Sequence, residues 1–207
     1  MTKVTVIGAG NIGGAVASLA SKAGASVQVL ARNPEQSATI AAPLGAVAGR
    51  IGDPITGDIV VLALPYGAVA EVLGGYEGAL GGKVLVDVTN PVDFQTFDDL
   101  VVPADSSAAR VIQDAVPGAR VVKAFNTNFG ATIATGEVGP LTTTVLAAGD
   151  DADAKQAVID LATAAGLRAI DAGALKRARE LEALAFLQIT LAAGEKTPWT
   201  GGFGLIG

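Results

Sequence analysis

The sequence predicts an α/β fold with a doubly wound, mainly parallel sheet. Short runs rich in β-branched residues alternate with alanine-rich stretches long enough for helices, a pattern typical of βαβ units. The strand-like runs are apolar at consecutive positions, as expected for strands covered by helices on both faces. The chain has 207 residues, half of them hydrophobic, which is enough for one large domain with a small C-terminal α/β extension.

The alternation assigns each element a range. The expected strands cover 4–7, 26–30, 58–64, 83–88, 119–125, 142–149 and 167–171. The expected helices cover 11–23, 34–42, 67–80, 105–116, 151–165 and 175–193. The stretch from Asn126 to Leu141 is the longest irregular segment expected. It predicts a boundary between a core domain, 1–140, and the extension, 141–207.

Composition excludes several classes of function. The net charge of −6 argues against nonspecific binding of nucleic acid, which needs a basic surface. The chain contains no cysteine and no histidine, so disulfides, thiolate metal sites, a histidine base and the commonest zinc ligand are all unavailable. We therefore expect no metal site and no nucleic-acid partner.

Mean hydropathy is high, at +0.49, so a membrane span has to be considered. The longest apolar stretches are short or carry polar residues, such as Glu182 and Gln188, and none approaches about 18 uninterrupted apolar residues. The N-terminus has no signal-peptide layout. The expectation is a cytoplasmic protein without a membrane partner.

The first strand leads into the segment GAGNIGG. Gly8, Gly10 and Gly13 fit G-x-G-x-x-G, with Ala9, Asn11 and Ile12 between them. A strand precedes the motif, a helix follows, and a second strand closes the unit, as in a Rossmann dinucleotide site. Gly8 would permit the tight turn, Gly10 the approach of a pyrophosphate and Gly13 close packing of helix on strand. The alternative is a turn that merely favours glycine.

The end of the second strand distinguishes the dinucleotides. NAD sites place an acid there, but this chain has Ala31, Arg32 and Asn33. An arginine can pair with the 2′-phosphate of NADP, which an acid would repel. We therefore predict NADP(H), with Arg32 as the main 2′-phosphate contact and Asn33 beside it. The alternative is that Arg32 is a solvated cation; FAD fits less well, since its sites usually carry a glutamate here.

Three further strand ends should line the nicotinamide crevice, because ligands of such sheets bind at the carboxyl ends of the strands. Small polar groups there could hydrogen-bond a carboxamide, although ordinary turn capping explains each of them equally well. The predicted cofactor residues at these ends are Leu64, Pro65, Tyr66, Thr89, Asn90, Pro91, Ala124, Asn126 and Thr127.

The chain as a whole resembles a known family. GAGNIGGAVA, LARNPE, LALPYGAVAEVL, LVDVTNP, VVKAFNT and GALKRARELEAL occur in the order found in the NADPH-dependent reductases of the deazaflavin coenzyme F-420, which have the cytosolic domains of membrane ferric reductases as relatives. The resemblance implies a Rossmann fold and hydride transfer between NADPH and the deazaflavin coenzyme F-420 as co-substrate. It also implies a homodimer.

Two departures from the family pattern bear on specificity. Ala31 and Gln36 stand where the family often has a serine and a lysine on the 2′-phosphate, and Ala9 replaces a common threonine. Arg32 remains and no acid replaces it, so the NADP prediction stands. The identity of the hydride acceptor is less constrained, and flavin, quinone and ferric acceptors remain alternatives.

The residue inventory suits hydride transfer, which depends on close stacking and excluded water more than on a side-chain acid. No catalytic side chain is therefore predicted. A ketone reductase would need a proton donor, for which Lys123, Lys176 and Tyr66 are candidates. Lys123 is more readily interpreted as a snorkelling strand residue. A noncatalytic NADP-binding redox sensor is the alternative from another class.

The C-terminal part raises the question of what covers the acceptor. Leu181, Leu184, Ala185 and Leu191 follow helical spacing, and the face they form fits either a subunit core or a dimer interface. Trp199 in the glycine-rich tail would either dock the tail or cover a bound ring, and docking is the preferred interpretation. We expect the extension to complete the acceptor site.

Overall fold

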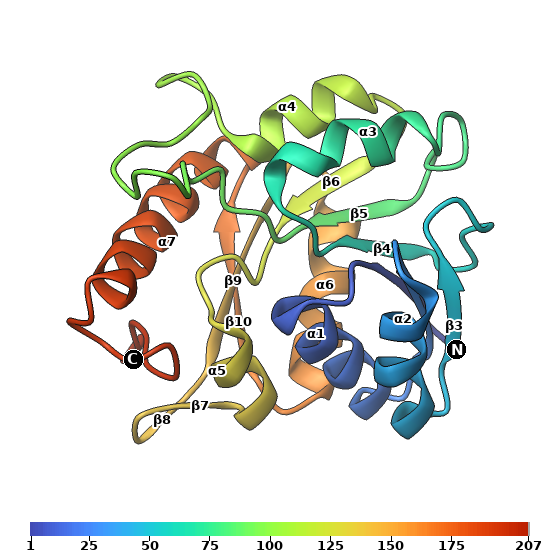
Figure 1. The fold of residues 1–207 in the computed structure, drawn as a ribbon, viewed down its shortest axis with the longest axis horizontal. Coiled ribbons are helices and arrows are strands. Elements are labelled where there is room, and N and C mark those ends of the chain that lie inside the picture. The colour runs from blue at the N-terminus through green and yellow to red at the C-terminus, as the bar shows by residue number, and fades with distance from the viewer. Residues whose placement is uncertain (207) are drawn as a thin grey trace.

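The structure is a computed structural model that describes residues 1–206. Eight strands form one sheet in the order β10-β9-β6-β5-β4-β1-β2-β3, and a small hairpin forms a second sheet (Figure 1). All neighbours in the large sheet run parallel except β6 and β9. The order of the first six strands, 3-2-1-4-5-6 along the chain, is that of a Rossmann fold, which confirms the predicted fold class.

The strands of the large sheet are short and mostly apolar. They are β1 (Lys3–Ile7), β2 (Ser26–Ala31), β3 (Val47–Arg50), β4 (Ile59–Leu62), β5 (Val84–Asp87), β6 (Arg120–Lys123), β9 (Thr144–Gly149) and β10 (Arg168–Gly173). The hairpin consists of β7 (Glu137–Val138) and β8 (Leu141–Thr142). Every residue of β4 and β5 is buried, as expected for central parallel strands.

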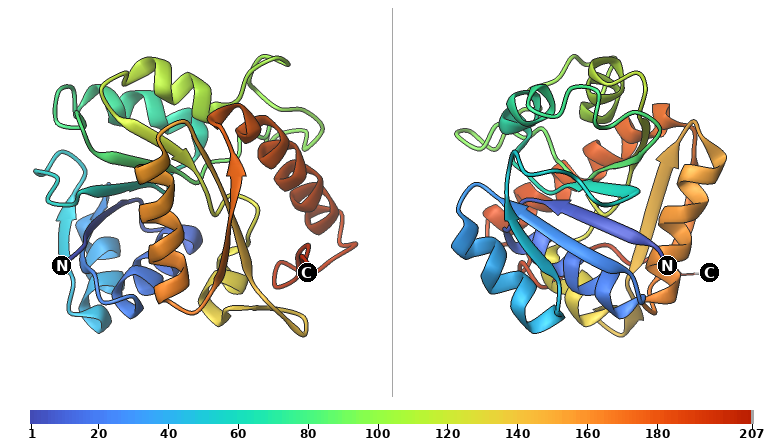
Figure 2. Two further views of the ribbon diagram at one scale, coloured as in Figure 1. Left: turned by 180° about the vertical axis from the view of Figure 1, so that it is seen from behind. Right: turned by 90° about the vertical axis from the view of Figure 1, so that its right-hand side faces the viewer.

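Helices cover both faces of the sheet, as the edge-on view shows (Figure 2). One core lies beneath α1 (Asn11–Lys22), α2 (Pro34–Ala41) and α6 (Ala152–Ala164), with α5 (Gly130–Thr135) against α1. The other lies beneath α3 (Val69–Gly74) and α4 (Ala108–Ala115). Short 3-10 turns occur at η1 (Ala42–Leu44), η2 (Tyr66–Ala68) and η3 (Leu175–Arg177), and α7 (Ala178–Ala193) is the longest helix described.

The predicted ranges were wrong in four places. The range 67–80 contains only α3, preceded by a 3-10 turn, and the helix predicted from 105 begins at Ala108. The stretch predicted to be irregular contains α5 and the β7–β8 hairpin, and the exposed edge strand β3 had no assigned range. The sheet is continuous across residue 140, because β9 pairs with β6, and the division into two functional parts stays a prediction.

Candidate functional site

The turn between β1 and α1 has two glycines that packing requires. Gly8 has a φ of +122°, and a Cβ added there would lie 2.0 Å from the carbonyl oxygen of Ala63. A Cβ added to Gly13 would lie 2.1 Å from the carbonyl oxygen of Gly8. Both positions therefore exclude any side chain, because β1, α1 and the end of β4 approach one another closely.

Gly10 differs from the other two glycines of the motif. It is exposed, and a Cβ added there would have no neighbour within 4 Å. Gly10 is also the N-cap of α1, and the first intrahelical bond recorded runs from the Gly14 N–H to its carbonyl, at 2.9 Å. The N–H groups of Asn11 and Ile12 precede that bond, so they have no partner within the helix. Open space and free N–H groups at a helix N-terminus suit a phosphate.

A cleft of about 770 Å³ opens at this turn. Its walls come from Ala9 to Ile12 of the motif, from residues 129–131 at the start of α5, and from Trp199 and Thr200 of the tail. The Trp199 ring packs on Phe129, with centroids 5.0 Å apart, and is itself 52% exposed. Trp199 therefore docks the tail on α5 and lines the cleft as well.

The end of β2 carries the residues that the sequence predicts at the adenosine end of the cofactor. Ala31 is buried as the last residue of the strand, and Arg32 is exposed immediately after it. Within residues 1–206 the Arg32 guanidinium forms no ion pair. Asn33 caps α2, because its Oδ1 accepts the N–H of Glu35 at 3.0 Å. The cation thus stands free beside a helix N-terminus.

The ends of β4, β5 and β6 meet at one edge of the sheet, because the three strands are parallel neighbours. Asn90 donates from Nδ2 to the carbonyl of Asn126 at 2.9 Å, and Asn126 donates from Nδ2 to Oδ1 of Asn90 at 3.0 Å. The structure therefore brings these two predicted residues together. The remaining predicted residues of this edge lie on the same three connections: Leu64, Pro65, Tyr66, Thr89, Pro91, Ala124 and Thr127.

Two features of this edge are energetically costly. Phe125 is buried with a φ of +62°, a conformation that costs a residue other than glycine about 1–2 kcal/mol and clusters at functional sites. In the part of the chain that the structure describes, the buried Oγ1 of Thr89 and Oδ1 of Asn126 have no hydrogen-bond partner. Such atoms are costly unless something satisfies them, and the buried Oδ1 of Asn128 and Oγ1 of Thr144 are in the same state.

Beneath this edge lies a buried ionic cluster that the sequence did not reveal. Nζ of Lys123 lies 2.8 Å from Oδ2 of Asp87 and 2.9 Å from Oε1 of Glu182, and it donates to the carbonyl of Thr89 at 2.5 Å. All three charged side chains are at most 1% exposed. The snorkelling interpretation of Lys123 was therefore wrong: its ammonium is fully buried, and two carboxylates and a carbonyl oxygen compensate its charge, as a buried ammonium requires.

Glu182 joins the C-terminal helix to α4. Its two carboxylate oxygens accept the N–H groups of Ala108 at 2.9 Å and Ala109 at 3.3 Å, at the start of α4. Burial raises the pKa of Glu182, and the Lys123 ammonium opposes that shift.

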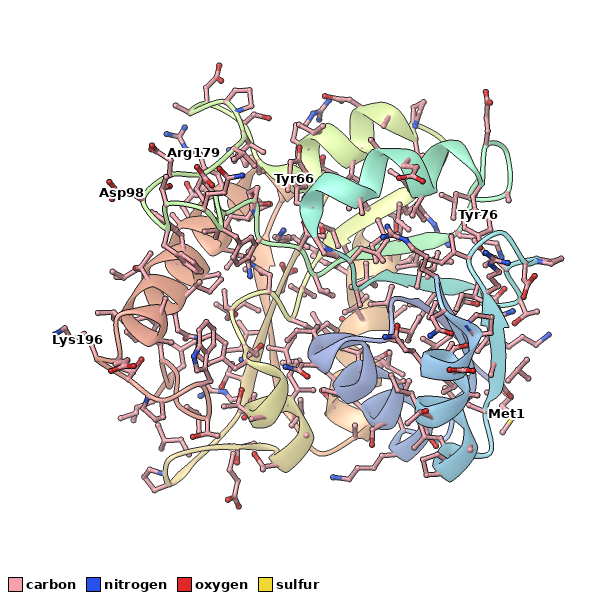
Figure 3. The ribbon with its side chains drawn as sticks, viewed as in Figure 1. Met1, Tyr66, Tyr76, Asp98, Arg179 and Lys196 are labelled. Carbon is pink, nitrogen blue, oxygen red and sulfur yellow. The ribbon has the colours of Figure 1, made fainter. Side chains whose placement is uncertain are left out.

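Tyr66 lies at the end of α3 that faces α7 (Figure 3). Its phenol pKa is raised, first by burial and then by the charges of Glu182 and Asp87.

The structure adds one observation about metal binding and one about membrane crossing. Residues 1–206 contain no cluster of three or more side chains able to hold a metal ion. Over the same residues, no helix combines the length and the apolar character that crossing a membrane requires.

The fold and the glycine turn are those of the Rossmann proteins that bind a dinucleotide at the carboxyl edge of the sheet. Comparison with known proteins gives the family within that class. Residues 3–91 match the family described as NADP oxidoreductase, coenzyme F420-dependent. The chain is 31% identical to an F420-dependent NADP reductase from Methanothermobacter thermautotrophicus, over 91% of this chain and 88% of that protein. The chain belongs to this family.

For two other relatives, the alignment with this chain covers a smaller share of the relative's length. The F420-dependent NADP reductase of Methanocaldococcus jannaschii is 34% identical over 70% of this chain and 66% of that protein. The metalloreductase STEAP3 of Rattus norvegicus is 30% identical over 88% of this chain and 36% of that protein. The aligned part of the chain thus spans about two thirds of the first relative and about one third of the second.

Solved structures agree on the fold. A structure from Arthrobacter sp. FB24, assigned to an F420-dependent NADP reductase, is 26% identical and covers both chains completely with a TM-score of 0.85. A hypothetical protein from Sinorhizobium meliloti is 30% identical over 84% of this chain and 86% of the other, with a TM-score of 0.75. An imine reductase from Myxococcus stipitatus, at 21% identity, 94% and 63% coverage and a TM-score of 0.67, shares the fold.

Proposed function

We propose that this protein transfers hydride between NADPH and the deazaflavin coenzyme F-420. The observation that carries the proposal is the open phosphate cradle at Gly10, followed along the chain by an unpaired arginine at the end of β2. The identity of the hydride acceptor is inferred from the relatives named F420-dependent NADP reductases, because this chain belongs to their family.

The described residues fit NADP(H). The free N–H groups after Gly10 would hold the pyrophosphate, Arg32 would bind the 2′-phosphate, and the orphaned oxygens of Thr89 and Asn126 would accept from the carboxamide. When bound, the nicotinamide supplies the hydride. The chain positions the ring and excludes water, which is what such a transfer demands of a protein.

No side chain of this edge is required as a proton donor. Lys123, the first candidate, is fully buried; it donates to Asp87 and Thr89 and forms an ion pair with Glu182, so its ammonium is already engaged within the protein. Lys176 is exposed in η3. The placement of the two lysines supports hydride transfer without a lysine acid, and Tyr66, which is half-buried at this edge, is the one candidate donor that keeps its place beside the site.

The extension and the assembly complete the proposal. We infer that α7 and the tail around Trp199 close the acceptor side of the cleft and that α7, whose Leu187 is 51% exposed, contributes to a homodimer interface. A cytoplasmic location is part of the same proposal. Light scattering tests the dimer, and cell fractionation tests the location.

A panel of acceptors tests the reaction. NADPH is mixed with the deazaflavin, with a flavin, with a quinone or with ferric chelate, and the absorbance of each acceptor is followed. We expect rapid loss of the deazaflavin absorbance. Tight NADPH binding without reduction of any acceptor would contradict the enzymatic proposal and favour a redox sensor.

One alternative has an observation of its own. The match to the metalloreductase STEAP3 covers most of this chain, which favours an NADPH-dependent ferric reductase as the alternative. The same panel distinguishes the two, because that alternative predicts turnover with a flavin or a ferric acceptor and none with the deazaflavin.

A further inference from the structure

We propose that Arg50, at the end of the edge strand β3, is a second ligand of the 2′-phosphate and shares with Arg32 the selection of NADPH over NADH. This inference rests on the proposed function. It assigns a role to an arginine that neither the glycine motif nor the residues after β2 identify. It also offers a reason why the chain can lack the serine and lysine replaced here by Ala31 and Gln36.

The register of the sheet places the two arginines together. Arg50 is the direct partner of Ala31 in the parallel β2–β3 pair, and the N–H of Ile51 donates to the carbonyl of Ala31 at 3.0 Å. Paired Cα atoms on neighbouring strands are about 5 Å apart, and Arg32 follows Ala31 by about 3.8 Å. The two arginine Cα atoms are therefore within about 9 Å, a gap that one phosphate between their side chains can bridge.

The side chain of Arg50 lies on the face of the sheet that α2 covers. A Cβ added to the preceding residue, Gly49, would lie 2.8 Å from Cδ2 of Leu30, which belongs to the core of the opposite face. Because side chains alternate along a strand, Arg50 points to the other face. Ala41 of α2 is part of the core on that face.

The start of α2 is held beside Arg50. The hydroxyl oxygen of Ser37, which is buried, lies 2.8 Å from the carbonyl oxygen of Gly49 and 2.9 Å from that of Pro34, so its one proton is shared between the two. The single hydroxyl thus ties the first turn of α2 to the residue before Arg50. A phosphate beside that turn would meet Arg32 and Arg50 together at the positive end of the α2 dipole, while the N–H groups of the turn stay bonded to Asn33.

No carboxylate of the described residues neutralises either cation. Arg32 and Arg50 are both exposed, and neither forms an ion pair within residues 1–206. Oδ2 of Asp53 accepts the backbone N–H of Arg50 at 2.7 Å and also lies 2.7 Å from the Cβ position of Gly49, on the opposite face. Glu35 is exposed on the first turn of α2, where solvent screens its charge.

Fluorescence titration with NADPH and with NADH tests the assignment on the wild type, Arg32→Ala, Arg50→Ala and Arg50→Lys. Arg110→Ala is the matched control, since it removes an exposed arginine from α4. We expect Arg50→Ala to raise the dissociation constant of NADPH about tenfold and leave that of NADH unchanged, as for loss of a charge-assisted hydrogen bond to phosphate. Arg50→Lys should weaken NADPH binding less than Arg50→Ala does, and the control should change neither dissociation constant.

The outcomes separate this inference from the proposed function. If the wild type binds NADPH no more tightly than NADH, the cofactor part of the proposed function fails and the role of Arg50 fails with it. If Arg32→Ala loses the preference for NADPH while Arg50→Ala keeps it, or if Arg50→Ala weakens both dinucleotides equally, only the assignment of Arg50 is overturned. Equal thermal midpoints would show that all variants are folded.

Discussion

Nζ of Lys123 lies 2.9 Å from Oε1 of Glu182, deep beneath the carboxyl edge of the sheet. The pair joins β6 to the C-terminal helix α7, and the same carboxylate accepts the N–H groups that open α4. The C-terminal helix is therefore tied to the Rossmann core by buried charges.

Replacement of Glu182 by glutamine should destabilise the fold. Both carboxylate oxygens accept hydrogen bonds, so the NH₂ group of a glutamine would have to face either the Lys123 ammonium or an N–H of α4. Breaking a buried pair costs about 3–5 kcal/mol, and we expect a loss in the free energy of unfolding near the lower end. Urea denaturation measures it.

The control for that variant is Glu180→Gln. Glu180 also belongs to α7 but is 57% exposed, where it pairs with Arg177. Its loss should cost less than about 0.5 kcal/mol. A Glu182→Gln protein as stable as this control would contradict a structural role for the buried cluster.

The stability contributed by Glu182 should depend on pH in a particular direction. Burial raises its pKa above the ordinary value of 4.5, so the folded state binds a proton more readily than the unfolded state. The contribution of Glu182 to the free energy of unfolding is complete below pH 4.5. It is lost as the pH rises through the raised pKa that Glu182 has in the folded protein.

The measurement is the difference in unfolding free energy between the wild type and Glu182→Gln at a series of pH values. We expect the advantage of the wild type to shrink as the pH rises from 4.5 toward neutrality. An advantage that grows over that interval would mean that the pKa of Glu182 is lowered in the folded protein.

The three motif glycines should respond differently to alanine. Gly10→Ala adds a methyl group in open space at an extended φ of −85°, so the unfolding free energy should change by less than about 1 kcal/mol. The same methyl group would obstruct the phosphate, and we expect the NADPH dissociation constant to rise by about tenfold or more. Isothermal titration and urea denaturation measure the two effects.

Gly13→Ala is the matched comparison, because its Cβ would lie 2.1 Å from the Gly8 carbonyl oxygen. We expect it to lose about 2–3 kcal/mol of stability or to fail to fold. If the Gly10→Ala protein binds NADPH as tightly as the wild type, the proposal that this turn binds the phosphate is contradicted.

Trp199 should report the occupation of the cleft. It is the one tryptophan of the chain, and it lines the cleft together with Gly10 and Asn11. We expect saturation with NADPH to change its fluorescence, and Trp199→Ala to weaken NADPH binding about 3- to 10-fold, as for a lost aromatic contact. Emission that is unaffected by NADPH would place the ligand elsewhere.

Local sequence signals predicted the frame of the molecule. The central strands are continuous apolar runs, and the glycine turn has a fixed spacing from the strand before it and the helix after it. Both can therefore be predicted from local sequence, without knowledge of long-range contacts. The edge strand β3 escaped prediction because its sequence, VAGR, is exposed and lacks an apolar run. The helix α5 escaped because GATIAT is rich in poor helix formers and ends at Gly136 with a φ of +80°.

The site was predicted as a set of strand ends, but its interior was not. Asp87, Lys123 and Glu182 lie far apart in the sequence, and each taken alone fits a surface role. Only the register of β5 with β6 and the return of α7 bring them together. Arg50 was missed for the same reason, since its relation to Ala31 is created by the pairing of β3 with β2.

Transfer of deuterium tests the central claim most directly. NADPH labelled with deuterium at nicotinamide C4 is incubated with the protein and the deazaflavin in ordinary water, using each C4 epimer in turn, and the reduced product is analysed by mass spectrometry. The account predicts that one epimer delivers its deuterium to a carbon of the reduced deazaflavin. A reduced product free of deuterium with both epimers, or no reduced product at all, would contradict it.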